Sequence, residues 1–508
     1  MHLRFVRRRR EEKEADSALL YCYMMDDHVH QSPILRVKQG EQLTMTVKND
    51  LKASYNMTLP PPGDCGSDVL TSESTNVHFH GIHVAPDCHQ DNVIRTLINP
   101  GEFFNFSFVI PMDQPPGLYW YHPHVFPNSQ EQIEGGASGV FFVEGMENIL
   151  PEVSGLPEQV IVFRSELIHP RVIQEHPNDP KKPQEDISIN YVPVRWPEYK
   201  PATLRMKPLE KQFWRIVNSC SATFVVLRLH YDFDLQQMIG VGRDNIPFGT
   251  NQYAEVHYGL TEWQIPAGSR IEIIVTAPPL GVKHARLVMH AMNNGLGGLS
   301  DPERTVLRIF PDVNAPPAPY TMPMSSGKQT AVQRVPSDLA LMTPITTREL
   351  DFWESPIDPN DPSKGSIYGL TPRGQPRIAF QDQHWASINA TQGTVEDWII
   401  YNHSPSTHVF HIHQMHFLVL EANGLVLGTK DSQFWDAIDV QCCGWNFLKL
   451  RIDFTGMLQF IEVKLTFLVM LYCRSYPGLL CLPLPHVRYG HPFLNTHYTC
   501  LLLMCFYL

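Results

Sequence analysis

The 508-residue sequence lacks the features of several large protein classes. Its apolar runs are far shorter than the roughly 20 residues that a membrane-spanning helix needs, so we expect no transmembrane span. Its net charge of -12 at pH 7 argues against a nucleic-acid partner, which calls for a basic surface. Its ten cysteines match neither a zinc ribbon nor a CxxC redox motif, and they give no disulfide map. A hydrophobic fraction of 43% and a mean hydropathy of -0.20 instead describe a soluble globular chain.

The N-terminal segment lacks the apolar core of roughly 7–15 residues that a signal peptide requires. Arginines at residues 7–10 are followed by Glu11 and Glu12, which predicts a solvated, disordered leader over residues 1–31, with the first strand starting near its end. Four N-x-S/T sequons point toward secretion instead: Asn56, Asn105, Asn389 and Asn402. The residues therefore leave the cellular compartment open.

The 43 prolines favour many short strands over long helices, because proline breaks helix interiors and sits at strand ends. "GEQLTMTVKND" places Leu43, Met45 and Val47 at alternate positions, and "GEFFNFSFVIP" does the same with phenylalanines. Strands of this length, separated by glycine and proline turns, predict an all-β antiparallel sandwich or barrel.

The strand pattern divides the chain into several units. Residues 32–150 and 348–455 contain similar turn and strand segments, "GEQLTMTVKND" and "GTVEDWIIYN", which suggests duplication of one β-domain. Residues 157–312 hold short strands with single, scattered histidines, and we interpret this unit as a spacer without metal. Residues 313–347 are rich in Pro, Ser and Gln, a composition that predicts a linker.

Histidines recur in pairs within β-type runs of the first and third units. The runs "VHFHG", "YWYHPHVF" and "HVFHIHQMHF" each carry one His-x-His pair: His78 and His80, His122 and His124, and His411 and His413. A strand's period of two aims both members of a pair at one face, roughly 6.6–6.8 Å apart. His408 stands at an odd offset from His411 and should face the opposite way, so this stretch could serve two sites. A fourth pair, His28 and His30, follows no such run and is interpreted as incidental.

Six imidazoles from three strands suit copper, zinc, iron or nickel better than magnesium or calcium, which prefer oxygen ligands. The structural alternative is a histidine-rich edge strand or histidines satisfied within the core, since most histidines bind no metal. Three pairs on three β-type runs favour the metal site. A zinc hydrolase needs three protein ligands and an open position, a requirement that three pairs exceed.

In this order, "VHFHG", "GLYWYHPH", "HVFHIHQMHF" and "FWDAIDV" resemble the motifs of the three-domain multicopper oxidases, the family of laccases and bilirubin oxidases. The resemblance extends over residues 20–455. It implies three cupredoxin-like Greek-key β-sandwiches, with a trinuclear copper cluster between the first and third and a mononuclear type 1 copper in the third. It also implies a secreted or extracytoplasmic protein.

The resemblance also implies roles for individual residues. By position, His78 and His411 would bind the type 2 copper. The type 3 pair would be bound by the other members of the three pairs: His80, His122, His124 and His413. His408 would bind the type 1 copper, and Asp91 resembles the acid that delivers protons near the cluster. His83 and His416 fall outside the matched positions, and we interpret them as supporting or structural.

The activity implied by the resemblance is one-electron oxidation of phenolic or similar small substrates, coupled to reduction of dioxygen to water. The partners would then be a small-molecule reducing substrate and dioxygen. Neither the particular substrate nor the oligomeric state can be read from the residues.

The family's fourth motif, His-Cys-His, occurs nowhere in the sequence. It supplies the type 1 cysteine and should follow "RIDFT", where the chain continues instead with "GMLQFIEV". We interpret residues 456–508 as an aberrant, unrelated-looking tail on an incomplete, truncated third domain. Two hypotheses follow: a copper-dependent oxidase whose type 1 cysteine is missing from the chain as written, and a non-enzymatic copper-binding cupredoxin protein.

Overall fold

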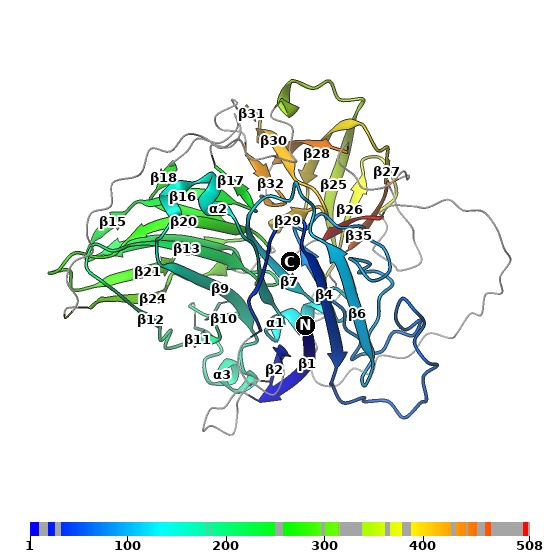
Figure 1. Cartoon of the computed structure of the whole chain (residues 1–508), viewed down its shortest axis with the longest axis horizontal. Helices are drawn as coiled ribbons and strands as arrows, with labels where there is room; N and C mark the ends of the chain where they lie inside the picture. The colour runs from blue at the N-terminus through cyan, green and yellow to red at the C-terminus, as the bar shows by residue number, and fades with distance from the viewer. Residues whose placement is uncertain are drawn as a thin grey trace.

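Three β-units surround a common centre in the computed structural model, the first blue to cyan, the middle one green and the third yellow to orange (Figure 1). Strands account for 47% of the structure and helices for 6%, which confirms the expected all-β class. The structure describes residues 1–9, 19–25, 32–179, 181–183, 185–248, 258–295, 300–312, 314, 338–360, 366–377, 388–427, 433–442, 446–454, 463–468 and 501–505.

The first unit contains two sheets, ordered β2-β1-β4-β6 and β3-β8-β7-β5. Met45, Phe79 and Tyr121, from strands of both sheets, belong to one buried apolar cluster, so the core lies between the sheets. The predicted alternation is confirmed in β4 and β6, where every second side chain is buried. The elements are β1 (His2–Arg9), β2 (Leu19–Met25), β3 (Leu35–Val37), β4 (Gln42–Asn49), β5 (His78–His80), β6 (Phe103–Val109), β7 (Gly117–His122), α1 (Ser129–Glu134), β8 (Gly139–Val143), α2 (Met146–Ile149) and η1 (Pro151–Val153).

The expected disordered leader is wrong for the described part of residues 1–31. Strand β1 pairs in parallel with β4 and antiparallel with β2. Leu3 and Phe5 are 1% and 0% exposed because they alternate toward the core of the first unit. The prediction of disorder rested on the charged residues 7–12, whereas the apolar side chains that anchor the strand precede them. His28 and His30 lie outside the described residues.

The middle unit packs a sheet ordered β11-β10-β9-β13-β20-β16-β17 against one ordered β12-β24-β21-β14-β15. Its elements are β9 (Glu158–Glu166), α3 (Pro170–Glu175), β10 (Asp186–Ile189), β11 (Val192–Val194), β12 (Ala202–Met206), β13 (Lys211–Asn218), β14 (Val225–Tyr231), β15 (Asp234–Gln236), β16 (Met238–Arg243), β17 (Ile246–Pro247), β18 (Tyr258–Leu260), β19 (Glu262–Ile265), β20 (Arg270–Thr276), β21 (Ala285–Met289), β22 (Met292–Asn293), β23 (Ser300–Asp301) and β24 (Arg304–Pro311).

The third unit has a sheet ordered β26-β25-β28-β34-β30-β31 and a separate pair, β29 with β33, which share one apolar core. Its elements are η2 (Leu339–Leu341), β25 (Thr346–Pro356), β26 (Ser366–Pro372), β27 (Ile388–Ala390), β28 (Val395–Asn402), β29 (His408–His411), β30 (Phe417–Ala422), β31 (Leu425–Val426), β32 (Phe434–Trp435), β33 (Ala437–Val440) and β34 (Phe447–Asp453). Strands β35 (Val463–Leu468) and β36 (Leu501–Cys505) join β27 in a small sheet. The remaining tail and most of the expected linker lie outside the described residues.

The three units meet in one buried apolar cluster. It contains Trp120 and Phe142 from the first unit, Phe224 from the middle unit, and Val409 and Ala437 from the third. Burial of such side chains stabilises the contact by roughly 1.5–3 kcal/mol each. The cluster holds β7 of the first unit close to β29 and β33 of the third, the strands that carry or adjoin two of the histidine pairs.

Two further features of the structure are the state of its described cysteines and the character of its helices. Cys65 and Cys88 form a disulfide that closes the loop containing β5, and Cys220 is a free, buried thiol. No helix in the described portion of the chain is long and apolar enough to cross a membrane.

Candidate metal centre

The three histidine pairs converge where the first and third units meet. The antiparallel register of β5 and β7 sets His78 opposite His122, so the first two pairs lie side by side. Rings then stack between the units: the ring centroids of His78 and His413 are 3.9 Å apart, and those of His80 and His411 are 4.0 Å apart. The structure thus brings together all six paired histidines: His78, His80, His122, His124, His411 and His413.

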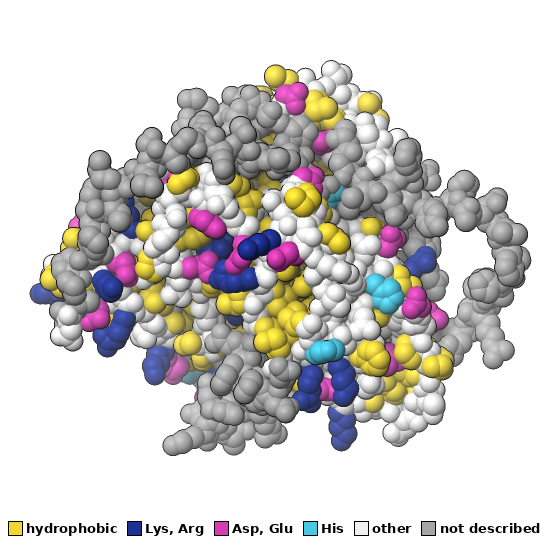
Figure 2. Space-filling view, in the orientation of Figure 1, with side chains coloured by type: hydrophobic (Ala, Val, Ile, Leu, Met, Phe, Trp, Pro, Cys, Tyr) yellow, Lys and Arg dark blue, Asp and Glu magenta, His cyan; other side chains and the backbone are white. Residues whose placement is uncertain are grey.

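All six rings are buried, none being more than 3% exposed. On the face drawn in Figure 2 the visible histidine side chains stand singly, in keeping with the burial of the paired ones. Burial lowers the pKa of every one of the six imidazoles, to about 3 for His124 and to about 4 for His411. A neutral imidazole presents a nitrogen lone pair, the form that binds a metal ion.

Buried ring nitrogens of this cluster lack a hydrogen-bond partner among the described residues, and they include Nε2 of His78, Nδ1 of His80 and Nε2 of His411. Leaving a buried polar atom unsatisfied costs about 1–3 kcal/mol, so such atoms call for an explanation. In His78 the opposite nitrogen, Nδ1, lies 2.9 Å from Asp91 Oδ2, and in His411 it lies 2.5 Å from the carbonyl oxygen of Asp436. An imidazole held by one nitrogen with the other left open is typical of metal-ligating histidine.

The spacing of the nitrogen atoms fits more than one metal ion. His78, His411 and His413 offer ring nitrogens that all lie within 4.8 Å of one another, and so do His78, His80 and His122. Imidazole suits copper among the first-row metals. The donor set and the open nitrogens therefore fit the copper ions that the sequence resemblance implies.

Asp91 is buried, and it contacts the first histidine pair. Its Oδ2 faces His78 Nδ1, and its Oδ1 accepts the backbone N–H of Phe79 at 3.0 Å. Burial raises the pKa of this carboxyl well above its ordinary value. The contact determines which nitrogen of His78 faces the other rings; a role in proton delivery stays a prediction.

His408 has different neighbours from the six, as its odd offset predicts. Its ring stacks on Phe352 with centroids 5.0 Å apart, and its Nε2 lies 2.7 Å from Ser404 Oγ. Burial lowers its pKa to about 4. It belongs to none of the groupings of close metal-binding atoms within the described residues.

His83 and His416 also lie outside those groupings. The backbone N–H of His83 donates to Gln114 Oε1 at 2.9 Å. His416 Nε2 donates to the backbone oxygen of Asp244 at 2.6 Å. These contacts tie the two histidines to neighbouring chain segments, and their supporting or structural role stays a prediction.

No role was predicted from the sequence for two charged residues that lie beside the centre, Asp436 and Arg270. The carboxylate of Asp436 accepts two N–H groups of Arg270, each at 2.7 Å, and its Oδ1 lies 3.4 Å from His80 Nε2. Burial acts to raise the pKa of Asp436, but Arg270 and His80 hold it well below its ordinary value. Asp436 was visible within the motif "FWDAIDV", whereas Arg270 in "GSRIEIIV" carries no motif signal.

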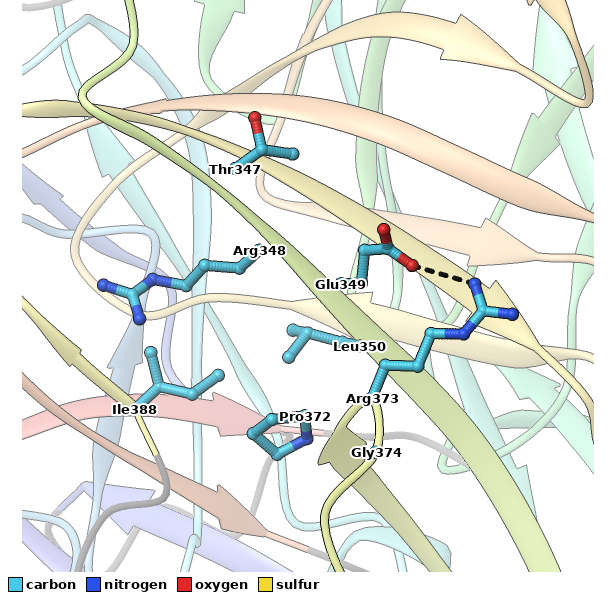
Figure 3. Close-up of a pocket in the computed structure, with 8 residues that line it drawn as sticks. All are labelled: Thr347, Arg348, Glu349, Leu350, Pro372, Arg373, Gly374 and Ile388. Atoms are coloured by element: carbon cyan, nitrogen blue, oxygen red, sulfur yellow. Dashed lines mark hydrogen bonds and ion pairs between the residues drawn. The ribbon is translucent and has the colours of Figure 1, made fainter.

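A surface pocket of about 530 Å³ in the third unit is separate from the histidines. Figure 3 shows its lining, with Arg373 paired to Glu349 at 2.8 Å. Arg348, the other basic side chain there, is held by both carboxylate oxygens of Glu396. Because both guanidinium groups are engaged by acids, the pocket offers no evident anion site.

Comparison with known proteins agrees with this geometry. Models of the multicopper oxidase family match residues 69–148 and 356–461, which hold all three histidine pairs. An iron transport multicopper oxidase of Gibberella zeae is 33% identical over 103 residues, 20% of this chain and 15% of that protein. A multicopper oxidase of Staphylococcus haemolyticus is 26% identical over 133 residues, 26% of this chain and 24% of that protein. The matched segments thus span less than a quarter of either relative.

Solved structures extend the likeness of fold to most of the chain. A multicopper oxidase from Campylobacter jejuni, described as a metallo-oxidase, superposes with a TM-score of 0.62 at 21% identity, covering 89% of this chain and 85% of that one. A laccase-like multicopper oxidase from Ochrobactrum sp. gives a TM-score of 0.63 at 18% identity, covering 89% and 90%. The likeness confirms the expected cupredoxin-like sandwiches. Both matched segments contain paired histidines, and the family models, the relatives and the solved structures all indicate a member of the multicopper oxidase family.

Proposed function

We propose that the protein is a copper-dependent oxidoreductase that oxidises phenolic or similar small molecules one electron at a time and reduces dioxygen to water. One observation carries the proposal: six buried, neutral imidazoles from two sandwiches face one another, and ring nitrogens of His78, His80 and His411 have no hydrogen-bond partner among the described residues.

Each of the six histidines has a place in this proposal. His78 and His411 would hold the type 2 copper, and the type 3 pair would be held by His80, His122, His124 and His413. Bound copper would supply reversible one-electron chemistry, since both of its oxidation states accept imidazole. The chain itself keeps the bases unprotonated by burying them, excludes bulk water from the space between the rings, and orients His78 through Asp91. Asp91 is also our candidate for proton delivery.

A second candidate function rests on the sequence. No His-Cys-His segment is present, so the sequence lacks the motif that would supply the cysteine of a type 1 copper site. The alternative is a copper-binding protein without oxidase activity. It predicts copper uptake without the intense thiolate-to-copper absorption of a His2Cys blue-copper site.

The deciding experiment measures dioxygen consumption by the copper-loaded full chain, with a phenol as reductant. We expect uptake that requires copper and that is lost in His80→Ala but kept in His284→Ala, which replaces an exposed histidine of the middle unit. Copper binding without dioxygen uptake in the unaltered protein would favour the non-enzymatic function. Failure to bind copper would reject both.

The Cys65–Cys88 disulfide supports a location outside the cytoplasm, because such bonds persist in oxidising compartments. Asn56 and Asn105 are exposed and accessible to glycosylation, whereas the amide of Asn402 is buried and donates to two backbone oxygens. We infer an extracytoplasmic protein, and cell fractionation with a thiol-trapping reagent would test this.

A further inference from the structure

Arg270 opens strand β20 of the middle unit and is completely buried. A guanidinium has five N–H groups, and each one here is used in a hydrogen bond. The acceptors are Leu118 O at 3.3 Å, Gly268 O at 3.1 Å, Asp436 Oδ1 at 2.7 Å, Asp436 Oδ2 at 2.7 Å, and Asn245 Oδ1. Leu118 belongs to the first unit and Asp436 to the third, so this one side chain joins all three sandwiches.

Asp436 in turn contacts two rings of the candidate centre. Its carbonyl oxygen accepts the Nδ1–H of His411 at 2.5 Å, and its Oδ1 lies 3.4 Å from His80 Nε2. These two rings stack on each other with centroids 4.0 Å apart. The position of Asp436 therefore determines which nitrogen each of the two imidazoles turns toward the other rings.

The Asp436 carboxylate could itself act as a metal ligand. One of its oxygens lies within 4.8 Å of ring nitrogens of His80 and His411, close enough for the three to share an ion. Both oxygens, however, accept N–H groups of Arg270 in a bidentate pair. Such a pair is short and charge-assisted, so the carboxylate is held toward the guanidinium.

The backbone at Gly81, directly after His80, packs against the Arg270–Asp436 ion pair. Gly81 has a φ of +86°, which L side chains rarely adopt. A Cβ placed there would lie 2.7 Å from Arg270 Nη2 and 3.2 Å from Asp436 Oδ2. The backbone next to a candidate ligand thus packs directly on the ion pair.

We propose that Arg270 is a positioning residue of the metal centre: by fixing Asp436 it orients His80 and His411 and keeps the carboxylate from ligating the metal. The middle sandwich is then part of the site although it contributes none of the paired histidines. The inference rests on the proposed copper function.

A purely structural ion pair between units is the competing explanation, since a buried ion pair is weak evidence for either stability or function. The chain offers a matched control. Arg451 is 8% exposed and makes a bidentate pair with Asp397 at 2.7 and 3.0 Å, and the other acceptors of its guanidinium are backbone oxygens in residues 339–342. Replacing either arginine by lysine keeps the charge and removes the planar fork.

The test uses the full chain, stripped of metal and titrated with copper against a competing chelator. For Arg270→Lys we expect copper affinity to fall about 10–100-fold and the copper electron paramagnetic resonance spectrum to change, as for other groups that orient metal ligands. Arg451→Lys should lower the melting temperature of the metal-free protein without changing either copper measurement. If Arg270→Lys does not fold, Asp436→Asn, which keeps the shape of the side chain, takes its place with the same expectation.

Two results would overturn the proposal. Arg270→Lys, or Asp436→Asn in its place, could bind copper with the affinity and spectrum of the unaltered protein. Alternatively, Arg451→Lys could lose copper to the same degree as Arg270→Lys, which would indicate a general effect of stability. Absence of copper binding by the unaltered protein is a different outcome, because it rejects the proposed function together with this inference.

Discussion

Two histidines on one strand, β29, have contrasting surroundings. His411 stacks on His80, with its Nδ1 held by a carbonyl and its Nε2 without a partner among the described residues. His408 stacks on Phe352 and meets the hydroxyl of Ser404. Both side chains are buried, so burial does not distinguish the two histidines. The difference lies in the convergence of other imidazoles, which happens on one side of β29 and not, within the described residues, on the other.

The largest expected effect is a difference in copper content between the alanine variants of His411 and His408. His411→Ala should lose copper because it removes a nitrogen donor from two groupings, the one with His78 and His413 and the one with His80 and Asp436. His408→Ala should keep the copper content of the unaltered chain. Elemental analysis after copper loading and desalting measures both. A loss of copper from His408→Ala would contradict this expectation and would show that His408 also holds a metal ion.

The pH dependence of the free energy of unfolding compares the same two histidines in the metal-free protein. Each of these histidines has a folded-state pKa of about 4, lowered by burial from about 6.5 in the unfolded chain. Between those values the unfolded state binds the extra proton, so each imidazole lowers the free energy of unfolding by about 1.4 kcal/mol per pH unit as the pH falls. Above about pH 6.5 the contribution is constant and the folded state keeps its full stability.

His411→Gln and His408→Gln should therefore flatten the acid side of the stability curve by similar amounts in the metal-free protein. Urea unfolding at several pH values measures the slopes. A flattening in only one variant would mean that the two sites already differ before any metal binds.

A smaller effect tests the contact beside His80. Gly81→Ala and Gly101→Ala introduce the same methyl group at φ values of +86° and +87°, so both should cost about 1–2 kcal/mol of backbone strain. Nothing lies within 4 Å of the Cβ at residue 101, whereas the one at residue 81 meets Arg270. We expect a further loss of roughly 1–3 kcal/mol for Gly81→Ala from overpacking. Equal free energies of unfolding in the two variants would contradict the close packing of residue 81 against Arg270.

Periodicity along single strands predicted much of this molecule. It gave the alternation of β4 and β6, and the two rings of each predicted histidine pair do lie close together. It did not find the Arg270–Asp436 pair, because these residues are 166 positions apart and neither belongs to a periodic pattern. It also misjudged the first strand, where two apolar side chains outweigh a run of arginines once β4 is available as a partner. Contacts between sandwiches depend on how the units dock, which no local pattern records.

The meeting of the three units in one apolar cluster also sets a temporal order. During synthesis domains generally fold from the N-terminus onward. The first two histidine pairs emerge early, the entire middle sandwich is then translated, and only afterwards does the third pair appear. A nascent chain therefore has a half-built centre for most of its elongation, and the complete imidazole shell exists only after the last sandwich docks.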